Sequence, residues 1–244
     1  MEIKWLRRAV GNGVEELSLF TVHLLTLIIG NSVMISWDLI AKHIAKVTGV
    51  SFEVSEQHPT RGGYINDSYM VTDGERRFFV KTNSPNQEDM FAAEAQGLST
   101  LVDAKVIRAP NPICHGHTKE HAYLVLEYIP LRKVDYRARA ALGRQLATLH
   151  RIVGKQFGWR WDNMIGATPQ QNDQSNDWVE FWHTQRLSSQ LNRAATNGYQ
   201  GRLMRQGDRL LSQLPAFFDG YSAVPSLLHG DLWNGNFSAT LPGE

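Results

Sequence analysis

The chain has 244 residues, 42% of them hydrophobic, which is enough for one large domain or two small lobes around a buried core. Lys and Arg number 25 and Asp and Glu 24, so the net charge is only +1 and a nucleic-acid partner is not expected. Cys114 is the single cysteine, which excludes an intrachain disulfide and suits a reducing, cytoplasmic compartment.

The first 33 residues differ in character from the rest. Residues 17–35 carry no formal charge and follow a short basic stretch, a pattern that fits a membrane span or a signal peptide. Glu15 and Glu16 argue against a signal peptide, and interspersed polar residues argue against a span. We therefore expect residues 1–33 to be an extension or apolar leader outside the working domain, with Met34 as an alternative start, and we expect no membrane role.

The first half of the chain alternates short apolar runs with turns. Asp73 and Gly74 predict a tight hairpin turn, because both residue types tolerate positive φ. Pro130 ends the last buried run of this half. In chain order we expect a helix at 36–48, strands at 51–56, 68–72 and 76–82, a helix at 87–102 and a buried strand at 122–129.

The second half shows helical periodicity. Leu142, Leu146 and Leu149 fall at helical spacing, and residues 157–174 predict a long loop. The sheet-rich first half and helix-rich second half predict an α+β fold with two unequal lobes: an antiparallel sheet plus a helix, then a mainly helical lobe. We expect helices at 136–151, 177–191 and 203–214.

The segment 229–236 (HGDLWNGN) carries the strongest chemical signal. Asp231 and Asn236, five residues apart on a loop with two glycines, can face one site. In phosphoryl transfer an Asp accepts or orients the proton of the substrate hydroxyl, and an Asn oxygen can hold Mg²⁺ against the phosphates. His229 would brace the loop. Taken alone, the same residues also fit a surface loop with a helix-capping Asp.

Lys81 closes an apolar run on the third predicted strand. Glu94 lies three residues after Phe91 and four before Leu98, so it shares the packed face of its helix. A carboxylate on that face is costly unless it is paired. We therefore predict a Lys81–Glu94 ion pair of the kind that positions phosphates, with two unrelated surface charges as the alternative.

Two backbone segments complete the set. Gly62 and Gly63 lie between two strands, where small residues let backbone N–H groups approach phosphates, although the segment is not a Walker motif. Glu127, Tyr128 and Ile129 follow the buried strand, where an extended segment between two lobes offers backbone groups to an adenine edge. Each segment also has a simpler interpretation, as turn glycines and as the end of a core strand.

A further group, Cys114, His115, His117 and His121, consists of metal-ligand residue types. Their spacing matches no common zinc pattern, and the group directly precedes a buried strand. We therefore expect no metal site at this position.

The chain resembles the fructosamine (ketosamine) kinase family, within the protein-kinase-like superfamily that includes the aminoglycoside phosphotransferases. Trp233 is informative, because aminoglycoside and choline kinases usually carry a different residue two places after the Asp. The resemblance covers roughly residues 34–244. The stretches that carry it are 62–69, 163–172 with 177–186, and 229–236.

The resemblance implies ATP- and Mg²⁺-dependent phosphorylation of a sugar hydroxyl on a ketosamine, either a small glycated amine or a glycated protein lysine. By matched position, Asp231 is the expected catalytic residue, Asn236 a Mg²⁺ ligand, Lys81 the phosphate-binding residue and Glu94 its partner. The segment from Glu127 to Ile129 is the expected adenine-binding linker. Residues 34–130 would form the nucleotide-binding lobe and residues 131–244 the catalytic lobe.

The sequence departs from the family pattern at its end. The family carries a second metal-binding Asp about a dozen residues beyond the Asn, whereas this chain ends at Glu244. We therefore expect the second lobe to be truncated and turnover to be impaired. Two alternatives remain open: a kinase-like phosphotransferase of aminoglycoside or choline type, and an inactive nucleotide-binding remnant. No oligomeric state is predicted.

Overall fold

The computed structural model describes residues 34–60, 65–166 and 168–241. The chain divides into two compact units, residues 1–35 and 36–244. The predicted leader at 1–33 lies outside the described residues, and nearly all described residues belong to the second unit. None of the helices in the described ranges combines the length and the apolar character needed to cross a bilayer.

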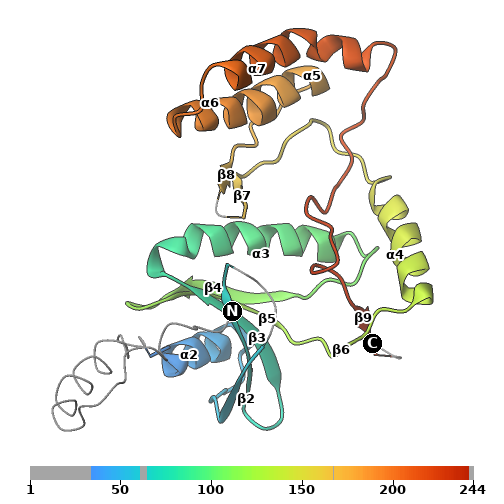
Figure 1. Ribbon diagram of the computed structural model, residues 1–244. Helices are drawn as coiled ribbons and strands as arrows, with labels where there is room; N and C mark the ends of the chain where they lie inside the picture. Colours follow the sequence, from blue (N-terminus) through green and yellow to red (C-terminus); the bar gives the residue numbers. More distant parts are fainter. Residues whose placement is uncertain (1–33, 61–64, 167, 242–244) are drawn as a thin grey trace, which may run out of the picture. The chain divides into compact units, whose positions relative to one another are not determined.

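A five-stranded antiparallel sheet dominates the first half of the second unit, with strand order β1-β2-β3-β5-β4 (Figure 1). Together with the helical second half, this sheet confirms the predicted α+β class. The strands are β1 (Glu56–Pro59), β2 (Asp67–Thr72), β3 (Arg77–Asn83), β4 (Pro112–His117) and β5 (Ala122–Glu127).

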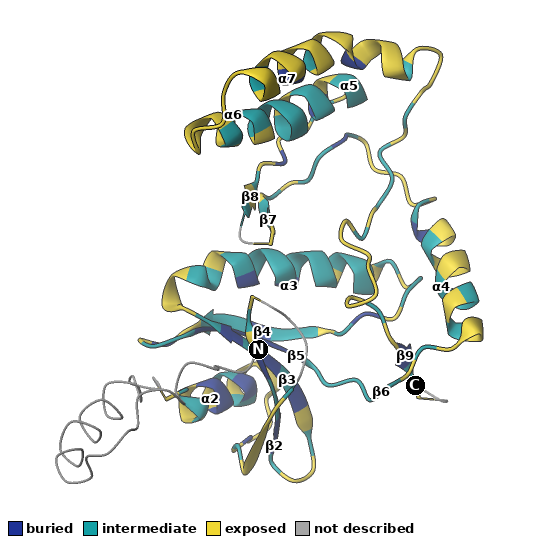
Figure 2. Cartoon of the chain, viewed as in Figure 1, coloured by how far each residue is buried: buried dark blue, intermediate teal, exposed yellow. Residues whose placement is uncertain are grey.

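Helices pack against both faces of this sheet, which explains why β5 is buried at five successive positions. On one face, Leu124 and its alternate neighbours join Phe91 of α3 (Glu88–Asp103) in the main core. On the other, Tyr123 Oη lies 2.7 Å from His43 Nδ1 of α2 (Trp37–Thr48), which contacts β4. Figure 2 shows the buried residues gathered on these strands and helices.

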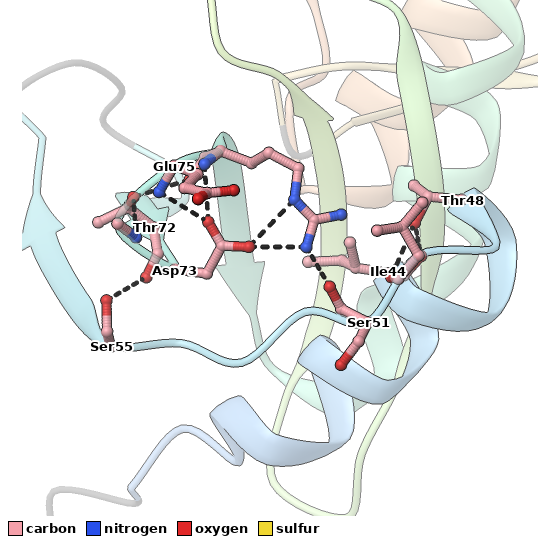
Figure 3. Close-up of polar contacts among 10 residues, drawn as sticks. Ile44, Thr48, Ser51, Ser55, Thr72, Asp73 and Glu75 are labelled. Carbon is pink, nitrogen blue, oxygen red and sulfur yellow. Dashed lines mark hydrogen bonds and ion pairs between the residues drawn. The ribbon is translucent and has the colours of Figure 1, made fainter.

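The β2–β3 turn is held by Asp73 and Arg76 rather than by the glycine alone. Gly74 has φ +98°, as predicted for a tight turn. The Asp73 carboxylate accepts hydrogen bonds from the backbone N–H of Arg76 (2.7 Å) and from its guanidinium Nε (3.0 Å). The same guanidinium also donates to the Ser51 carbonyl (Figure 3). The turn is therefore tied to the chain that leaves α2.

The second half is mainly helical and more exposed; α4 buries only Leu149, and α7 only Gly207 (Figure 2). There are also two short two-stranded sheets: β6 pairs with the distant β9, and β7 pairs with β8 in a local hairpin. The helices are α4 (Tyr136–Leu149), α5 (Trp178–Phe181), a π-helical segment (Trp182–Ser188), α6 (Ser189–Thr196) and α7 (Arg202–Gln213). The short strands are β6 (Leu131–Arg132), β7 (Asn163–Ile165), β8 (Thr168–Gln170) and β9 (Ala239–Thr240).

Three sequence predictions need correction. Residues 51–55 are not a strand; β1 begins at Glu56, because Phe52 packs edge-on against Phe78 and the Ser51 carbonyl is held by Arg76. The predicted long loop at 157–174 contains the β7–β8 hairpin. Strand β4 is absent from the predicted elements; its Pro112 is tolerated because it is the first residue of an edge strand.

Candidate active site

The structure brings Lys81 and Glu94 together. Lys81 Nζ donates to Glu94 Oε1 at 2.5 Å, and the two side chains are 26% and 29% exposed. Lys81 lies on β3 opposite Leu124 of β5, and Glu94 lies on α3, which packs over β5. The pair therefore joins the helix to the sheet, with the ammonium group fixed at the sheet surface.

A second pair forms in the loop 229–236. Asn236 Nδ2 donates to Asp231 Oδ2 at 2.7 Å and to the Asp231 carbonyl at 2.8 Å. The backbone N–H of Asp231 lies 3.2 Å from His229 Nδ1, as expected for a bracing histidine. Gly230 has φ +89°, so the sharp turn before Asp231 needs a glycine. These bonds hold an exposed carboxylate in one orientation.

Trp233 folds back over the same loop. A Cβ built on Gly235 would lie 2.3 Å from the Trp233 ring, so the ring packs directly against the backbone of Gly235. The backbone N–H of Asn236 donates to the Trp233 carbonyl at 2.9 Å. With 52% of its surface exposed, Trp233 presents an aromatic surface close to Asp231.

The linker after β5 is anchored by the side chain of Glu127. Its carboxylate accepts from the Arg108 guanidinium, from the backbone N–H of Asn111 (3.1 Å) and from Asn111 Nδ2 (2.9 Å). Chiefly through Arg108, these bonds lower the pKa of Glu127 to about 2. The Glu127 N–H is also bonded, to the Asn111 carbonyl. Within the described chain, no hydrogen bond uses the backbone of Tyr128 or Ile129.

Strand pairing connects the linker to both pairs. Lys81 is three residues along β3 from Phe78, which pairs with Glu127 at the start of the linker. Just beyond the linker, β6 pairs with β9, and Arg132 Nε donates to the Thr240 carbonyl at 3.0 Å. Strand β9 begins three residues after Asn236. Two short hydrogen-bonded connections thus lead from the linker to the Lys81–Glu94 pair and to the Asp231–Asn236 loop.

Not every predicted residue can be placed. Gly62 and Gly63 lie outside the described residues, although the ends of their loop are described. At these ends Thr60 donates its N–H to the Ser68 carbonyl at 2.8 Å, and Asn83 Nδ2 donates to Asn66 Oδ1 at 2.7 Å. In the part of the chain that is described, no hydrogen bond or ion pair joins the Lys81–Glu94 pair directly to the Asp231–Asn236 pair.

Comparison with known proteins identifies the family. The model of the fructosamine kinase family matches residues 36–244. The chain belongs to the fructosamine kinase family. It is 38% identical over 212 residues to the Synechocystis protein named "Probable ketoamine kinase slr1563", covering 85% of this chain and 70% of that protein. It is 34% identical over 219 residues to "Protein-ribulosamine 3-kinase, chloroplastic" of Oryza sativa subsp. japonica, covering 88% of this chain and 62% of that protein.

Solved structures of similar proteins support the same family assignment. A candidate fructosamine-3-kinase from Haemophilus somnus superposes with a TM-score of 0.74 at 26% identity, covering 82% of this chain and 68% of that one. A second, from Thermobifida fusca, gives 0.67 at 27% identity, covering 83% and 72%. The predicted resemblance to fructosamine kinases and the predicted kinase-like fold are confirmed, and family membership implies ATP as the phosphoryl donor.

The donor atoms of this fructosamine kinase fit a hard divalent cation only in part. Both side-chain hydrogen bonds that Asn236 makes to Asp231 use the amide nitrogen, which leaves its Oδ1 able to bind a cation. Among the residues described, no three His, Cys, Asp or Glu side chains are grouped to hold a metal. A cation at this site would therefore take most of its remaining ligands from phosphate oxygens and water, as Mg²⁺ in kinases does.

Proposed function

We propose that this chain transfers a phosphoryl group from ATP to a sugar hydroxyl of a ketosamine. The observation that carries the proposal is the Asn236–Asp231 hydrogen bond, which fixes a carboxylate on a loop tied by β9 and β6 to the linker. The names of the relatives, ketoamine kinase and protein-ribulosamine 3-kinase, support this substrate class. Both small glycated amines and glycated protein lysines belong to it.

The proposed reaction assigns a role to each of these four residues. Asp231 accepts or orients the proton of the attacking hydroxyl, and Asn236 holds Asp231 while its oxygen faces Mg²⁺. Lys81, fixed by Glu94, neutralises phosphate charge. Bound Mg²⁺ would offset the charge that develops on the phosphate oxygens.

The adenine would meet the backbone of the linker. Tyr128 and Ile129 have backbone groups outside any described hydrogen bond, whereas the side chain and N–H of Glu127 are already used. We therefore assign Glu127 an anchoring role and leave base recognition to its carbonyl and to the next two residues. Gly62 and Gly63 would cover the phosphates.

The proposed lobes follow from the same assignment. Residues 34–130 carry the sheet, α3 and the Lys81–Glu94 pair, and would form the nucleotide-binding lobe. Residues 131–244 carry the Asp231–Asn236 loop and would form the catalytic lobe. A reducing, cytoplasmic compartment suits a chain whose single cysteine, Cys114, is buried and free.

The test is a comparison of substrates on purified protein. Mg-ATP should raise the melting temperature, and a fructosyl-amine should be phosphorylated faster than an aminoglycoside or choline. Asp231→Asn is the matched negative control, because it keeps the shape of the loop and removes the carboxylate. Stabilisation by Mg-ATP without turnover on any alcohol would favour a nucleotide-binding remnant, and turnover on aminoglycosides alone would favour the other phosphotransferase class.

A further inference from the structure

Among the described residues of the second half, Asn172 is the most buried polar one, with 2% of its surface exposed. Its side-chain Nδ2 donates to the Trp161 carbonyl (3.0 Å) and to Asn163 Oδ1 (2.9 Å). Its backbone N–H donates to Asp162 Oδ1 at 2.9 Å. Asn172 follows β8, and its three partners lie just before β7 or at its start. Its hydrogen bonds therefore hold the two ends of the β7–β8 hairpin together.

The remaining acceptor of Asn172 is satisfied from a different element. Arg186 Nη2 donates to Asn172 Oδ1 at 2.7 Å, and Nη1 of the same guanidinium donates to the Gln171 carbonyl at 2.7 Å. The guanidinium also lies 4.6 Å from the centre of the Phe181 ring. Arg186 belongs to the π-helical segment Trp182–Ser188, a rare conformation that often occurs at functional sites.

These bonds close residues 157–175 into a compact loop, here called the strap. Its ends meet where Phe157 and Ser175 exchange backbone hydrogen bonds of 2.9 and 3.1 Å. Gly158, with φ +94°, lies so close to the far side of the strap that a Cβ would be 2.7 Å from the Asn172 carbonyl. The strap is therefore held at its ends and around its centre, and Arg186 attaches it to the helices.

The strap lies against α3, the helix that carries Glu94. Strand β7 contacts α3, and Figure 1 shows the short β7–β8 hairpin next to this helix. Beside this contact, a cavity of about 470 Å³ is lined by the α3 residues Asp89 and Gln96 and by Arg160 and Trp161 of the strap. The Arg160 guanidinium stacks on the Trp161 ring, 3.8 Å from its centre.

The hairpin tip also lies close to Ile65, two residues before β2. A Cβ built on Gly166 would lie 3.9 Å from Ile65 Cδ1. Ile65 in turn offers its carbonyl to Asn83 Nδ2 at 3.0 Å, at the end of β3. The strap thus approaches the nucleotide-binding half at two places, at α3 and at Ile65 just before β2.

We propose that Asn172 and Arg186 are positioning residues for phosphoryl transfer: their bond fixes the strap, the strap fixes α3, and α3 holds Glu94 against Lys81. Neither residue touches the reacting atoms, and the inference rests on the proposed function. Displacement of reacting groups by about 1 Å can cost on the order of 100-fold in rate, so a loosened strap has a kinetic effect beyond any loss of stability.

A double-mutant cycle with Glu94 tests the inference. Arg186→Ala should raise the dissociation constant of a non-hydrolysable Mg-ATP analogue about 10-fold in the wild-type background, and less than about 2-fold when Glu94→Gln is already present. Equal effects in the two backgrounds would overturn the inference, because a purely structural role for Arg186 does not depend on Glu94. Nucleotide affinity needs no ketosamine, so failure of this cycle is distinct from failure of the proposed function.

Two further variants keep the test decisive. Arg186→Lys retains the charge but lacks the fork that reaches both Gln171 and Asn172, so it should show the same dependence on Glu94 with a smaller loss of stability. Arg193→Ala, on the exposed face of α6, is the matched control and should leave the affinity unchanged. A loss of affinity in Arg193→Ala as large as that in Arg186→Ala would also overturn the inference. All affinities are measured below the lowest melting temperature of the set.

Discussion

Asn236 Nδ2 donates to Asp231 Oδ2 at 2.7 Å, which leaves the amide oxygen of Asn236 turned from the carboxylate that the nitrogen binds. One planar amide therefore has two separate functions: its nitrogen orients the candidate base, and its oxygen is free to meet a cation. The two residues should consequently respond differently to substitution.

Asp231→Asn should lower turnover by at least about 100-fold, since a positioned general base contributes on the order of 10²–10⁴. The affinity for Mg-ATP should change by less than about 2-fold, because the new amide oxygen can still accept from Asn236. Steady-state kinetics and calorimetry measure the two quantities. Asp219→Asn, an exposed change outside the site, is the control. Unchanged turnover in Asp231→Asn would remove the proposed role of the carboxylate.

Asn236→Ala should instead change how turnover depends on the Mg²⁺ concentration. Loss of a ligand or of its orienting partner costs about 10- to 100-fold in metal affinity, so the Mg²⁺ concentration for half-maximal turnover should rise by about that factor. A titration of activity with Mg²⁺ at saturating ATP measures it. Asn192→Ala on α6 is the control and should titrate like the wild type. If Asn236→Ala reduced turnover without shifting the Mg²⁺ midpoint, Asn236 would orient Asp231 only.

Lys81→Met should weaken nucleotide binding by about 10-fold or more, because a hydrogen bond to a charged group contributes about 1.5–3 kcal/mol. The change also leaves Glu94, which is 29% exposed, without its partner. Direct binding of an ATP analogue measures the effect. Lys119→Met, on the exposed turn between β4 and β5, should bind normally. Wild-type affinity in Lys81→Met would exclude the phosphate-binding role.

The Lys81–Glu94 pair could be predicted because local periodicity determines its geometry. The alternation of residues along β3 places Lys81 on the face of the sheet that α3 covers. The helical spacing from Phe91 places Glu94 on the side of α3 that faces the sheet. Two short-range patterns are therefore enough to predict the pair. The Asp231–Asn236 pair was equally local, since its two residues lie only five positions apart on one loop.

The strap could not be predicted in the same way. Asn172 and Arg186 both fall within stretches quoted for the family resemblance, yet neither residue has a local pattern that reveals burial. Asn172 is buried where hydrogen bonds from the other side of the strap and from Arg186 converge on it. Burying an amide without hydrogen-bond partners would be costly. The burial of Asn172 therefore depends on these contacts and cannot be predicted from the residue type alone. A polar side chain whose every partner is non-local gives no periodic signal.

Cys114 should be inert in the folded protein. Its side chain is 7% exposed, and burial raises the pKa of its thiol to about 12. At pH 8 the reactive thiolate is therefore a very small fraction, and a disulfide reagent such as DTNB should release one equivalent of chromophore only after the protein is unfolded in guanidinium. Rapid release from the folded protein at pH 8 would show that β4 opens from the sheet.

Glu127→Gln should reveal a pH-dependent part of the stability. The Arg108 guanidinium is the main cause that lowers the pKa of Glu127 from 4.5 to about 2, so the folded state favours the carboxylate. A group with a lowered pKa in the folded state stabilises the protein above its unfolded pKa, and this contribution is lost as the pH falls from about 4.5 toward 2. Because the side chain is 30% exposed, solvent screening limits the effect to about 1 kcal/mol.

Urea denaturation of the wild type and Glu127→Gln at pH 7, and at steps from pH 5 to pH 3, checks this prediction. The wild type should be more stable by about 1 kcal/mol at pH 7, and the difference should shrink below about pH 4.5. Glu53→Gln is the control, because Glu53 is exposed and accepts no hydrogen bond among the described residues. A stability difference that stayed constant from pH 7 to pH 3 would mean that the shape of Glu127, rather than its charge, anchors the linker to Arg108 and Asn111.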